Sequence, residues 1–297
     1  MQAAGKPNVI LFLLLTAALL IAVLLQPTEA GLPAQEAYAE GLLFAQEATP
    51  APQAAPTPDA AVQSVFRVEV IRPAETPDIP PKRILIYHSH TWEAYTQDGA
   101  HPYKETEKWR TKDNSANVVA VGSALKACLE ALGCDVTHDV TAFEPPDLAN
   151  AYVRSLTMLE SRKAAGETYD LYIDLHRDAY DDPNAIRRTV TVGGQESARF
   201  MVLIGKGTGM TGSGYDVRPD WEANYAIAER ITASLNAQAD RLGRSVCLRT
   251  GRFNQHIAPC SVLIECGSNH NTLEEVLSGV PYLAHAIDQT LRQQSDE

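Results

Sequence analysis

The sequence lacks an excess of basic residues, and this excludes one large class of function. Its 297 residues include 25 Lys and Arg against 37 Asp and Glu, which gives a formal net charge of −12. A nucleic-acid-binding protein needs a basic surface to contact phosphates, so this charge argues against nucleic acid as a partner. The carboxylates are dispersed along the chain, and the charge therefore mainly indicates a soluble surface.

Closely spaced cysteines and internal repeats are also absent. The five cysteines are Cys128, Cys134, Cys247, Cys260 and Cys266. An odd number of cysteines at wide spacing predicts neither a disulfide framework nor a cysteine zinc knuckle. We expect free, buried cysteines, with a bond between Cys128 and Cys134 as the alternative.

A long apolar run lies near the start of the chain. Residues 9–25 are apolar except for Thr16, and Lys6 precedes them. As a helix this run would rise about 26 Å, the short end of what spans a bilayer. We predict a transmembrane signal anchor over residues 1–26, with a cleaved secretory signal as the alternative. Because the nearby positive charge precedes the run, we expect the rest of the chain outside the cytoplasm, at the cell membrane.

The next segment is rich in alanine, proline, glutamine and glutamate. Residues 27–64 cannot bury enough apolar surface to fold, and their prolines favour an extended chain. We therefore predict a disordered linker over residues 27–64, which tethers a folded domain over residues 65–297. That remainder, about 230 residues, is a normal size for a single domain.

Strand and helix signals alternate along this domain. The order predicts an α/β fold with a mostly parallel central sheet flanked by helices. The predicted strands cover residues 83–87, 134–137, 170–175, 188–192, 199–204, 245–248 and 261–265. The predicted helices cover residues 115–132, 147–165, 220–242, 271–277 and 281–293.

Polar residues stand where three of these apolar strands end. His88 and His90 follow the first strand, His176 follows the strand at 170–175, and Glu265 ends the last one. The carboxyl ends of strands form the ligand crevice of an open α/β sheet. Two histidines and a carboxylate in such a crevice can hold Zn²⁺ with an open fourth position.

We predict His90 and His176 as metal ligands, with Glu93 close enough in sequence to bind the same ion. His88 competes with His90, since strand alternation places both on one side and spacing does not choose between them. A shared ion requires the two imidazoles to lie within about 8 Å of each other, because each Zn–N bond is about 2 Å.

The remaining candidates each have a functional and a structural interpretation. Glu265 is a candidate general base, or it forms a salt bridge to an arginine such as Arg177. Arg177 either binds a substrate carboxylate or forms a surface pair. Asp178 either orients an imidazole or caps a helix. Asn254 either lines the cleft or forms a turn.

Several segments, in the same order along the chain, resemble the stage II sporulation protein P family over roughly residues 83–290. The segment at 88–95 reads His-Ser-His-Thr-Trp-Glu-Ala-Tyr, and that at 173–178 reads Ile-Asp-Leu-His-Arg-Asp. The others cover residues 111–122, 137–141, 198–202, 254–259 and 263–275. His256 departs from the family pattern, in which we expect an aspartate.

The resemblance implies a zinc-dependent N-acetylmuramoyl-L-alanine amidase fold for the domain and a single N-terminal membrane helix. It implies cleavage of stem peptides from peptidoglycan, and in some members of peptide cross-links, during engulfment of the forespore. It also implies two partners, a lytic transglycosylase called stage II sporulation protein D and a membrane protein called stage II sporulation protein M. By the same resemblance the zinc ligands are His90, Glu93 and His176, and the catalytic glutamate is Glu265.

Two other functions remain open on the sequence alone. One is a zinc peptidase that acts only on the stem peptide. The other is a wall-binding protein with a dead site, against which the presence of His90, Glu93, His176 and Glu265 argues.

Overall fold

The computed structural model describes residues 80–182, 189–209 and 215–293. The predicted signal anchor over residues 1–26 and the predicted linker over residues 27–64 lie outside the described residues, as does the start of the predicted domain. Among the helices in the described ranges, none combines the length and the apolar composition needed to cross a bilayer.

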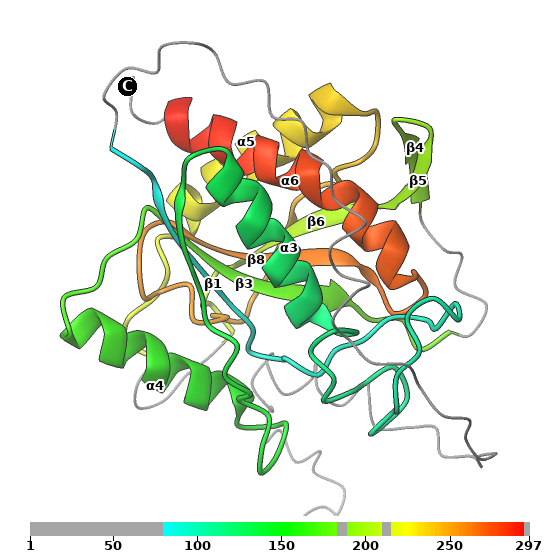
Figure 1. Ribbon diagram of the computed structural model, residues 1–297. Helices are drawn as coiled ribbons and strands as arrows, with labels where there is room; N and C mark the ends of the chain where they lie inside the picture. Colours follow the sequence, from blue (N-terminus) through cyan, green and yellow to red (C-terminus); the bar gives the residue numbers. More distant parts are fainter. Residues whose placement is uncertain (1–79, 183–188, 210–214, 294–297) are drawn as a thin grey trace, which may run out of the picture. The chain divides into compact units, whose positions relative to one another are not determined.

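A six-stranded sheet forms the centre of the domain, in the order β2-β1-β3-β8-β6-β7 (Figure 1). Its neighbouring strands are parallel except for β6 and β8, which are antiparallel. The predicted α/β fold with a mostly parallel sheet is therefore confirmed. The sheet strands are β1 (Arg83–Tyr87), β2 (Asp135–His138), β3 (Leu171–Asp178), β6 (Phe200–Gly205), β7 (Cys247–Arg249) and β8 (Ser261–Ser268).

Three helices cover one face of the sheet, and one helix lies against the other face (Figure 1). Helices α3 (Val118–Ala131), α5 (Trp221–Gln238) and α6 (Leu273–Gln293) pack over the main hydrophobic core. Helix α4 (Ala151–Ala164) lies on the opposite face, with a smaller apolar cluster beneath it. We call this second side of the sheet the α4 face.

Strand β3 shows how the sequence divides between these two faces. Ile173 is fully buried in the main core, whereas its neighbour Tyr172 packs with Leu159 of α4. Because successive side chains of a strand point to opposite faces, the even-numbered residues of β3 point to the α4 face. Asp174 and His176 therefore lie on that side, which is where the polar site forms.

Several strand predictions need correction. Strand β8 runs to Ser268, so Glu265 lies within the strand rather than at its predicted end. Strand β3 runs to Asp178, beyond the predicted end at residue 175, because its last residues still pair with β8. His176 therefore lies within the strand rather than after it. The turn at Gly193 and Gly194 joins β4 (Thr189–Val192) to an additional strand, β5 (Gln195–Ala198), and the two form a separate antiparallel hairpin.

The two helices predicted near the end of the chain are one continuous helix, α6, with Pro281 inside it. An internal proline removes a backbone hydrogen bond and costs about 3 kcal/mol. Val280, Leu283 and Ile287 of this helix are fully buried in the main core. Burial of such side chains contributes about 1.5–3 kcal/mol each, which outweighs the cost of the proline.

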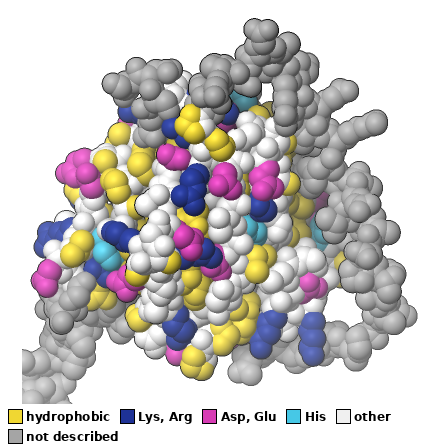
Figure 2. Space-filling model, turned by 60° about the vertical axis from the view of Figure 1, so that its left-hand side comes forward, with side chains coloured by type: hydrophobic (Ala, Val, Ile, Leu, Met, Phe, Trp, Pro, Cys, Tyr) yellow, Lys and Arg dark blue, Asp and Glu magenta, His cyan; other side chains and the backbone are white. Residues whose placement is uncertain are grey.

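The cysteines and the charges follow the sequence predictions. All five cysteines are free, so the alternative bond between Cys128 and Cys134 does not form. Figure 2 shows acidic and basic side chains interspersed on the face in view, as dispersed charges predict.

We expect Gly122 of α3 to resist substitution. A Cβ at this position would lie 2.5 Å from Nε2 of His138 and 2.8 Å from Nε2 of His88. These two imidazoles are hydrogen-bonded to each other at 2.8 Å, so neither can move away without breaking that bond. Gly122→Ala should lower the free energy of unfolding by about 1–2 kcal/mol in urea denaturation, even after alanine's gain in helix propensity. The exposed Ser123→Ala on the same helix is the control, and equal stability of the two variants would contradict this packing argument.

Candidate active site

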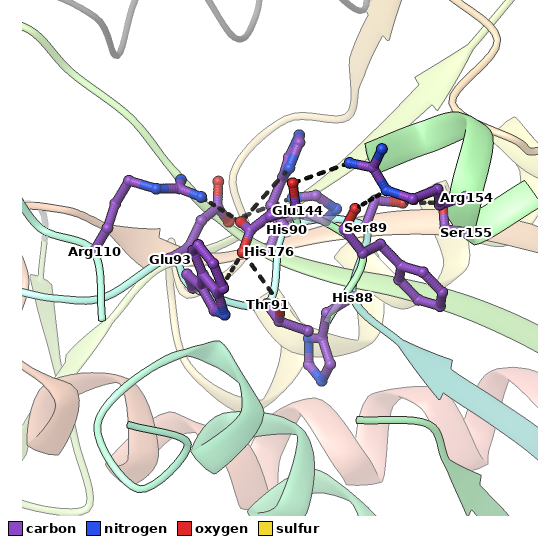
Figure 3. A network of polar contacts seen from close by, with 12 residues as sticks. His88, Ser89, His90, Thr91, Glu93, Arg110, Glu144, Arg154, Ser155 and His176 are labelled. Atoms are coloured by element: carbon purple, nitrogen blue, oxygen red, sulfur yellow. Dashed lines mark hydrogen bonds and ion pairs between the residues drawn. The ribbon is translucent and has the colours of Figure 1, made fainter. Parts of the chain in front are cut away.

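Four predicted site residues lie on the α4 face, near the carboxyl ends of β1, β3 and β8, and Figure 3 shows three of them, His90, Glu93 and His176, close together. His90 and Glu93 lie in the loop after β1, His176 lies in β3 and Glu265 lies in β8. His176 and Glu265 are register partners on adjacent parallel strands, so their side chains lie side by side on one face. Each of the four is at most 3% exposed.

The imidazole of His176 is held between two carboxylates. Its Nε2 lies 2.8 Å from Oδ1 of Asp174, and its Nδ1 lies 3.3 Å from Oε2 of Glu93. Burial lowers the pKa of His176, but the charges of Asp174 and Glu93 outweigh burial and raise it well above its usual value. Asp174 thus orients the ring so that Nδ1 faces the interior of the site.

His90 lies edge-on to this ring. The centroids of the His90 and His176 imidazoles are 5.3 Å apart, within the limit of about 8 Å that a shared ion sets. Nδ1 of His90 lies 3.8 Å from Oε1 of Glu144. Burial, and then the charge of His176, lower the pKa of His90 to about 3, so this imidazole is neutral at ordinary pH and suited to bind a metal.

Glu93 completes this group from the loop after β1. Its Oε2 also accepts a hydrogen bond from the backbone N–H of Arg177, at 3.1 Å. Burial raises the pKa of Glu93, but His176 and Arg177 outweigh burial and hold it below its usual range. The side chain therefore stays ionised although it is 1% exposed.

Tyr152 of α4 closes the site from the side opposite the sheet. Its ring lies 5.2 Å from the ring of His90 and stacks at 6.3 Å on that of His176. Burial, followed by the charges of Asp174 and Glu265, raises the pKa of Tyr152 well above its usual value. Because the charge of Glu265 acts on Tyr152, its carboxylate belongs to the same buried cluster.

The described part of the chain contains no group of three or more His, Cys, Asp or Glu side chains arranged to hold a metal ion together. Within the site, however, Nδ1 of His90 and Nδ1 of His176 are buried and have no hydrogen-bond partner among the described residues. Buried polar atoms normally have hydrogen-bond partners, and a neutral imidazole nitrogen that lacks one can bind a metal ion. The donor set of His90, His176 and Glu93 therefore fits a zinc ion.

Glu144 is a member of the site that sequence reasoning missed. Its carboxylate accepts hydrogen bonds from the backbone N–H of Trp92 and the hydroxyl of Thr91, and it forms a buried ion pair with Arg110. Burial raises its pKa to about 7, against the opposing effect of Arg110. Glu144 lies in an irregular segment with no periodic pattern, so no sequence signal indicated it.

The choice between His88 and His90 follows from the hydrogen bonds of His88. Its Nδ1 lies 2.8 Å from the carbonyl of Leu175, and its Nε2 lies 2.8 Å from Nε2 of His138. Both nitrogens are therefore occupied. The expectation that His88 and His90 share one side was wrong, because β1 ends at Tyr87 and the chain then turns.

Asp178, the predicted orienting carboxylate, does not contact either imidazole of the site in the described structure. It accepts hydrogen bonds from Arg244 at 2.6 Å and from the hydroxyl of Tyr180 at 2.9 Å. Asp174 orients His176 instead. Alternation along the strand does not separate the two carboxylates, since Asp174 and Asp178 are each two residues from His176. The pairing of β3 with β8 shifts register between His176 and Asp178.

The two predicted substrate-binding residues are buried and bonded within the protein. The guanidinium of Arg177 donates to the carbonyls of Ala94 and Trp109, and the residue is fully buried. The side-chain amide of Asn254 donates to the carbonyl of Tyr152 and the hydroxyl of Ser155. This geometry gives both residues positioning roles and offers no support for contact with substrate.

A comparison with family models identifies the family of this chain. Residues 43–288 match the family described as stage II sporulation protein P. Comparison with curated proteins gives no match.

Three similar solved structures are amidases, each aligned at a TM-score below 0.5. The CwlD amidase of Clostridioides difficile, in complex with the GerS lipoprotein, has 17% identity and a TM-score of 0.46, over 73% of this chain and 100% of that one. An N-acetylmuramoyl-L-alanine amidase of Clostridium difficile 630 has 12% identity and a TM-score of 0.45, over 74% and 99%. The amidase AmiC2 of Nostoc punctiforme has 14% identity and a TM-score of 0.43, over 73% and 98%. None of these likenesses assigns a role to a residue of this chain.

The buried histidine pair beside the site predicts an acid-sensitive fold. Burial, and then Lys126, lower the pKa of His138 to about 4, below the unfolded value near 6.5. The native state therefore binds fewer protons than the unfolded state between these values, and stability should fall as the pH drops from about 6.5 toward 4. His138→Gln should flatten this dependence in thermal unfolding followed between pH 4 and 7. Replacing the exposed His285 by Gln should leave it unchanged, and identical slopes for both variants would exclude His138 as a source.

Asp174→Asn should destabilise the protein more than a matched change on the same segment. Oδ1 of Asp174 accepts from the backbone N–H of Ser89 and from His176, while Oδ2 accepts from the hydroxyl of Ser89. In asparagine an amide nitrogen, which does not accept, replaces one of the two accepting oxygens, and the negative charge beside His176 is lost. We therefore expect a loss of about 1–3 kcal/mol in the free energy of unfolding. Asp170→Asn, at an exposed carboxylate just before β3, is the control. A loss at position 174 no larger than that at position 170 would show that these bonds contribute little.

Proposed function

This chain belongs to the stage II sporulation protein P family, and we propose that it is a peptidoglycan hydrolase of sporulation. The bond that we propose it cleaves is the amide between N-acetylmuramic acid and the L-alanine of the stem peptide. The proposal rests on one observation: the side chains of His90, His176 and Glu93 lie close together in the protein interior, beside the strand position of Glu265. The chain that holds them belongs to this family. The site has the residue types that a metal-assisted amide hydrolysis requires.

We propose that His90, Glu93 and His176 hold Zn²⁺. The support is the pair of buried Nδ1 atoms without hydrogen bonds and the ionised state of Glu93 beside them. Zinc bound there would supply a Lewis acid that polarises the amide carbonyl and activates a water molecule. Asp174 contributes by holding the ring of His176 through Nε2, which leaves Nδ1 as the ligand atom.

The chain's own proton carrier in this proposal is Glu265. Its carboxylate takes the proton from the attacking water and then gives it to the nitrogen of the leaving L-alanine. Full burial of Glu265 and its place beside His176 support this role, since a carboxylate in a dry site is a strong proton acceptor. Tyr152 limits the entry of other water by covering the imidazoles.

Location and partners extend the proposal beyond the domain. We propose that residues 1–26 anchor the chain in the cell membrane and that the tether over residues 27–64 lets the domain reach the wall in the septal space. Peptidoglycan is the proposed substrate. Sporulation protein D-like and M-like partners, as implied by the family resemblance, are part of the same proposal.

Glu265→Gln in the full chain should keep zinc but lose wall hydrolysis. Removal of a general base lowers rates by about 10²–10⁴-fold, so we expect at least a hundredfold loss in release of soluble fragments from purified sacculi. Zinc content, measured by elemental analysis after mild purification, should stay at the parent level. The exposed Glu274→Gln on α6 is the control and should retain both zinc and activity.

Mass spectrometry of the digested sacculi separates this function from its rivals. An amidase releases stem peptides with free L-alanine amino ends and leaves unsubstituted lactyl groups on the glycan. Products cut only within the stem peptide would instead establish a zinc peptidase. Absence of both zinc and wall cleavage in the parent protein would establish a wall-binding protein with a dead site.

A further inference from the structure

A cleft on the α4 face lies beyond Tyr152, away from the zinc ligands proposed above. Its volume is about 640 Å³, and its walls come from α4 and from the segments 215–217 and 252–257. The residues that give it chemical character are Glu160, Lys163, Tyr215, Arg252 and His256. We call it the α4 cleft.

The α4 cleft concentrates positive charge in a protein whose net charge is −12. Arg252 lies over the ring of Tyr215 at 4.6 Å and donates a hydrogen bond to the carbonyl of Val217. Lys163 donates to the carbonyl of Ile257 across the cleft, at 3.1 Å. These contacts fix two cations in the walls, and among the described residues that line the cleft Glu160 is the one acidic side chain.

His256 lines the cleft together with these two cations. Burial, and then the charges of Arg252 and Lys163, lower the pKa of His256 to about 4. Its Nδ1 is buried and has no hydrogen-bond partner among the described residues. The positive side chains of Arg252 and Lys163 are the groups in the cleft that suit a carboxylate.

The cleft lies further along α4 than the candidate active site, because Leu156 and Glu160 of its wall follow Tyr152 at four-residue spacing on one face of the helix. Asn254 of the 252–257 segment is bonded to Tyr152 and Ser155, at the end of α4 that borders the site. At 1.5 Å per residue, Glu160 and Lys163 lie about 12 and 16 Å along the helix from Tyr152. An extended peptide advances about 3.3–3.6 Å per residue, so four residues span about 14 Å.

We propose that the α4 cleft is a binding subsite for the acidic stem peptide of the substrate, with Arg252 and Lys163 contacting its carboxylates. This inference rests on the proposed function, which places the first stem residue at the zinc site. In the stem peptide, the residues after the first carry free carboxylates and aliphatic side-chain carbons. The cleft matches them with its cations and with the apolar side chains of Leu156 and Ile257.

Binding of a free stem peptide tests the subsite without requiring catalysis. The probe is L-alanyl-γ-D-glutamyl-meso-diaminopimelyl-D-alanine, titrated calorimetrically into the full chain carrying Glu265→Gln. Adding Arg252→Gln or Lys163→Gln should weaken binding about tenfold each, since a hydrogen bond to a charged group contributes about 1.5–3 kcal/mol. The same peptide with its carboxylates converted to carboxamides should bind equally weakly to all forms.

Lys126→Gln is the matched control, because it removes one positive charge from α3 on the other face of the sheet. Its affinity for the probe should equal that of the parent. Lys163 is exposed, so its variant tests the subsite even where Arg252→Gln disturbs folding.

The proposal is overturned if the parent does not bind the peptide, if the carboxamide binds as well as the acid, or if Lys163→Gln binds like Lys126→Gln. Failure of the amidase proposal shows separately, in the products of digested sacculi. A chain that binds the acidic peptide through these residues yet leaves sacculi intact would keep the subsite and lose the proposed reaction.

Discussion

The site depends on the hydrogen bonds that the carboxylate of Asp174 accepts. It accepts hydrogen bonds from the backbone and hydroxyl of Ser89 and from His176, so it joins the turn after β1 to strand β3. The turn carries His90 and Glu93, and the strand carries His176. Two further contacts join the same segments, since His88 bonds to the carbonyl of Leu175 and Glu93 accepts from the backbone N–H of Arg177. Asp174 thus sets both the tautomer of one imidazole and the place of the other.

Charge balance is the second constraint on this buried region. Glu144 is paired with Arg110, and Glu93 lies against His176 and the backbone N–H of Arg177. Buried charges are costly unless they are paired, and removal of one partner leaves the other uncompensated. His176 and Arg177 therefore keep Glu93 ionised although it is buried, whereas burial raises the pKa of Glu144 to about 7 in spite of Arg110.

Helix α4 covers the site on the side that faces away from the sheet. The other three long helices pack over the opposite face of the sheet, so α4 and the 252–257 segment are left to shape the face on which His176 and Glu265 lie (Figure 1). One end of α4 supplies Tyr152 above the imidazoles, and the rest forms a wall of the α4 cleft. A single helix therefore links the proposed chemistry to the proposed recognition of the peptide.

Much of this protein was predictable from local sequence pattern. Apolar periodicity located nearly all of the strands and helices, and the polar residues at strand ends identified His90, His176 and Glu265 as neighbours, because parallel strands end at one edge of a sheet. The tertiary structure decided which polar group contacts which. His88 turns toward His138, Asp174 rather than Asp178 holds His176, and Arg177 bonds to backbone carbonyls. Glu144 enters the site from an irregular loop. Such pairings join residues that are distant along the chain, and hydrophobic periodicity contains no information about them.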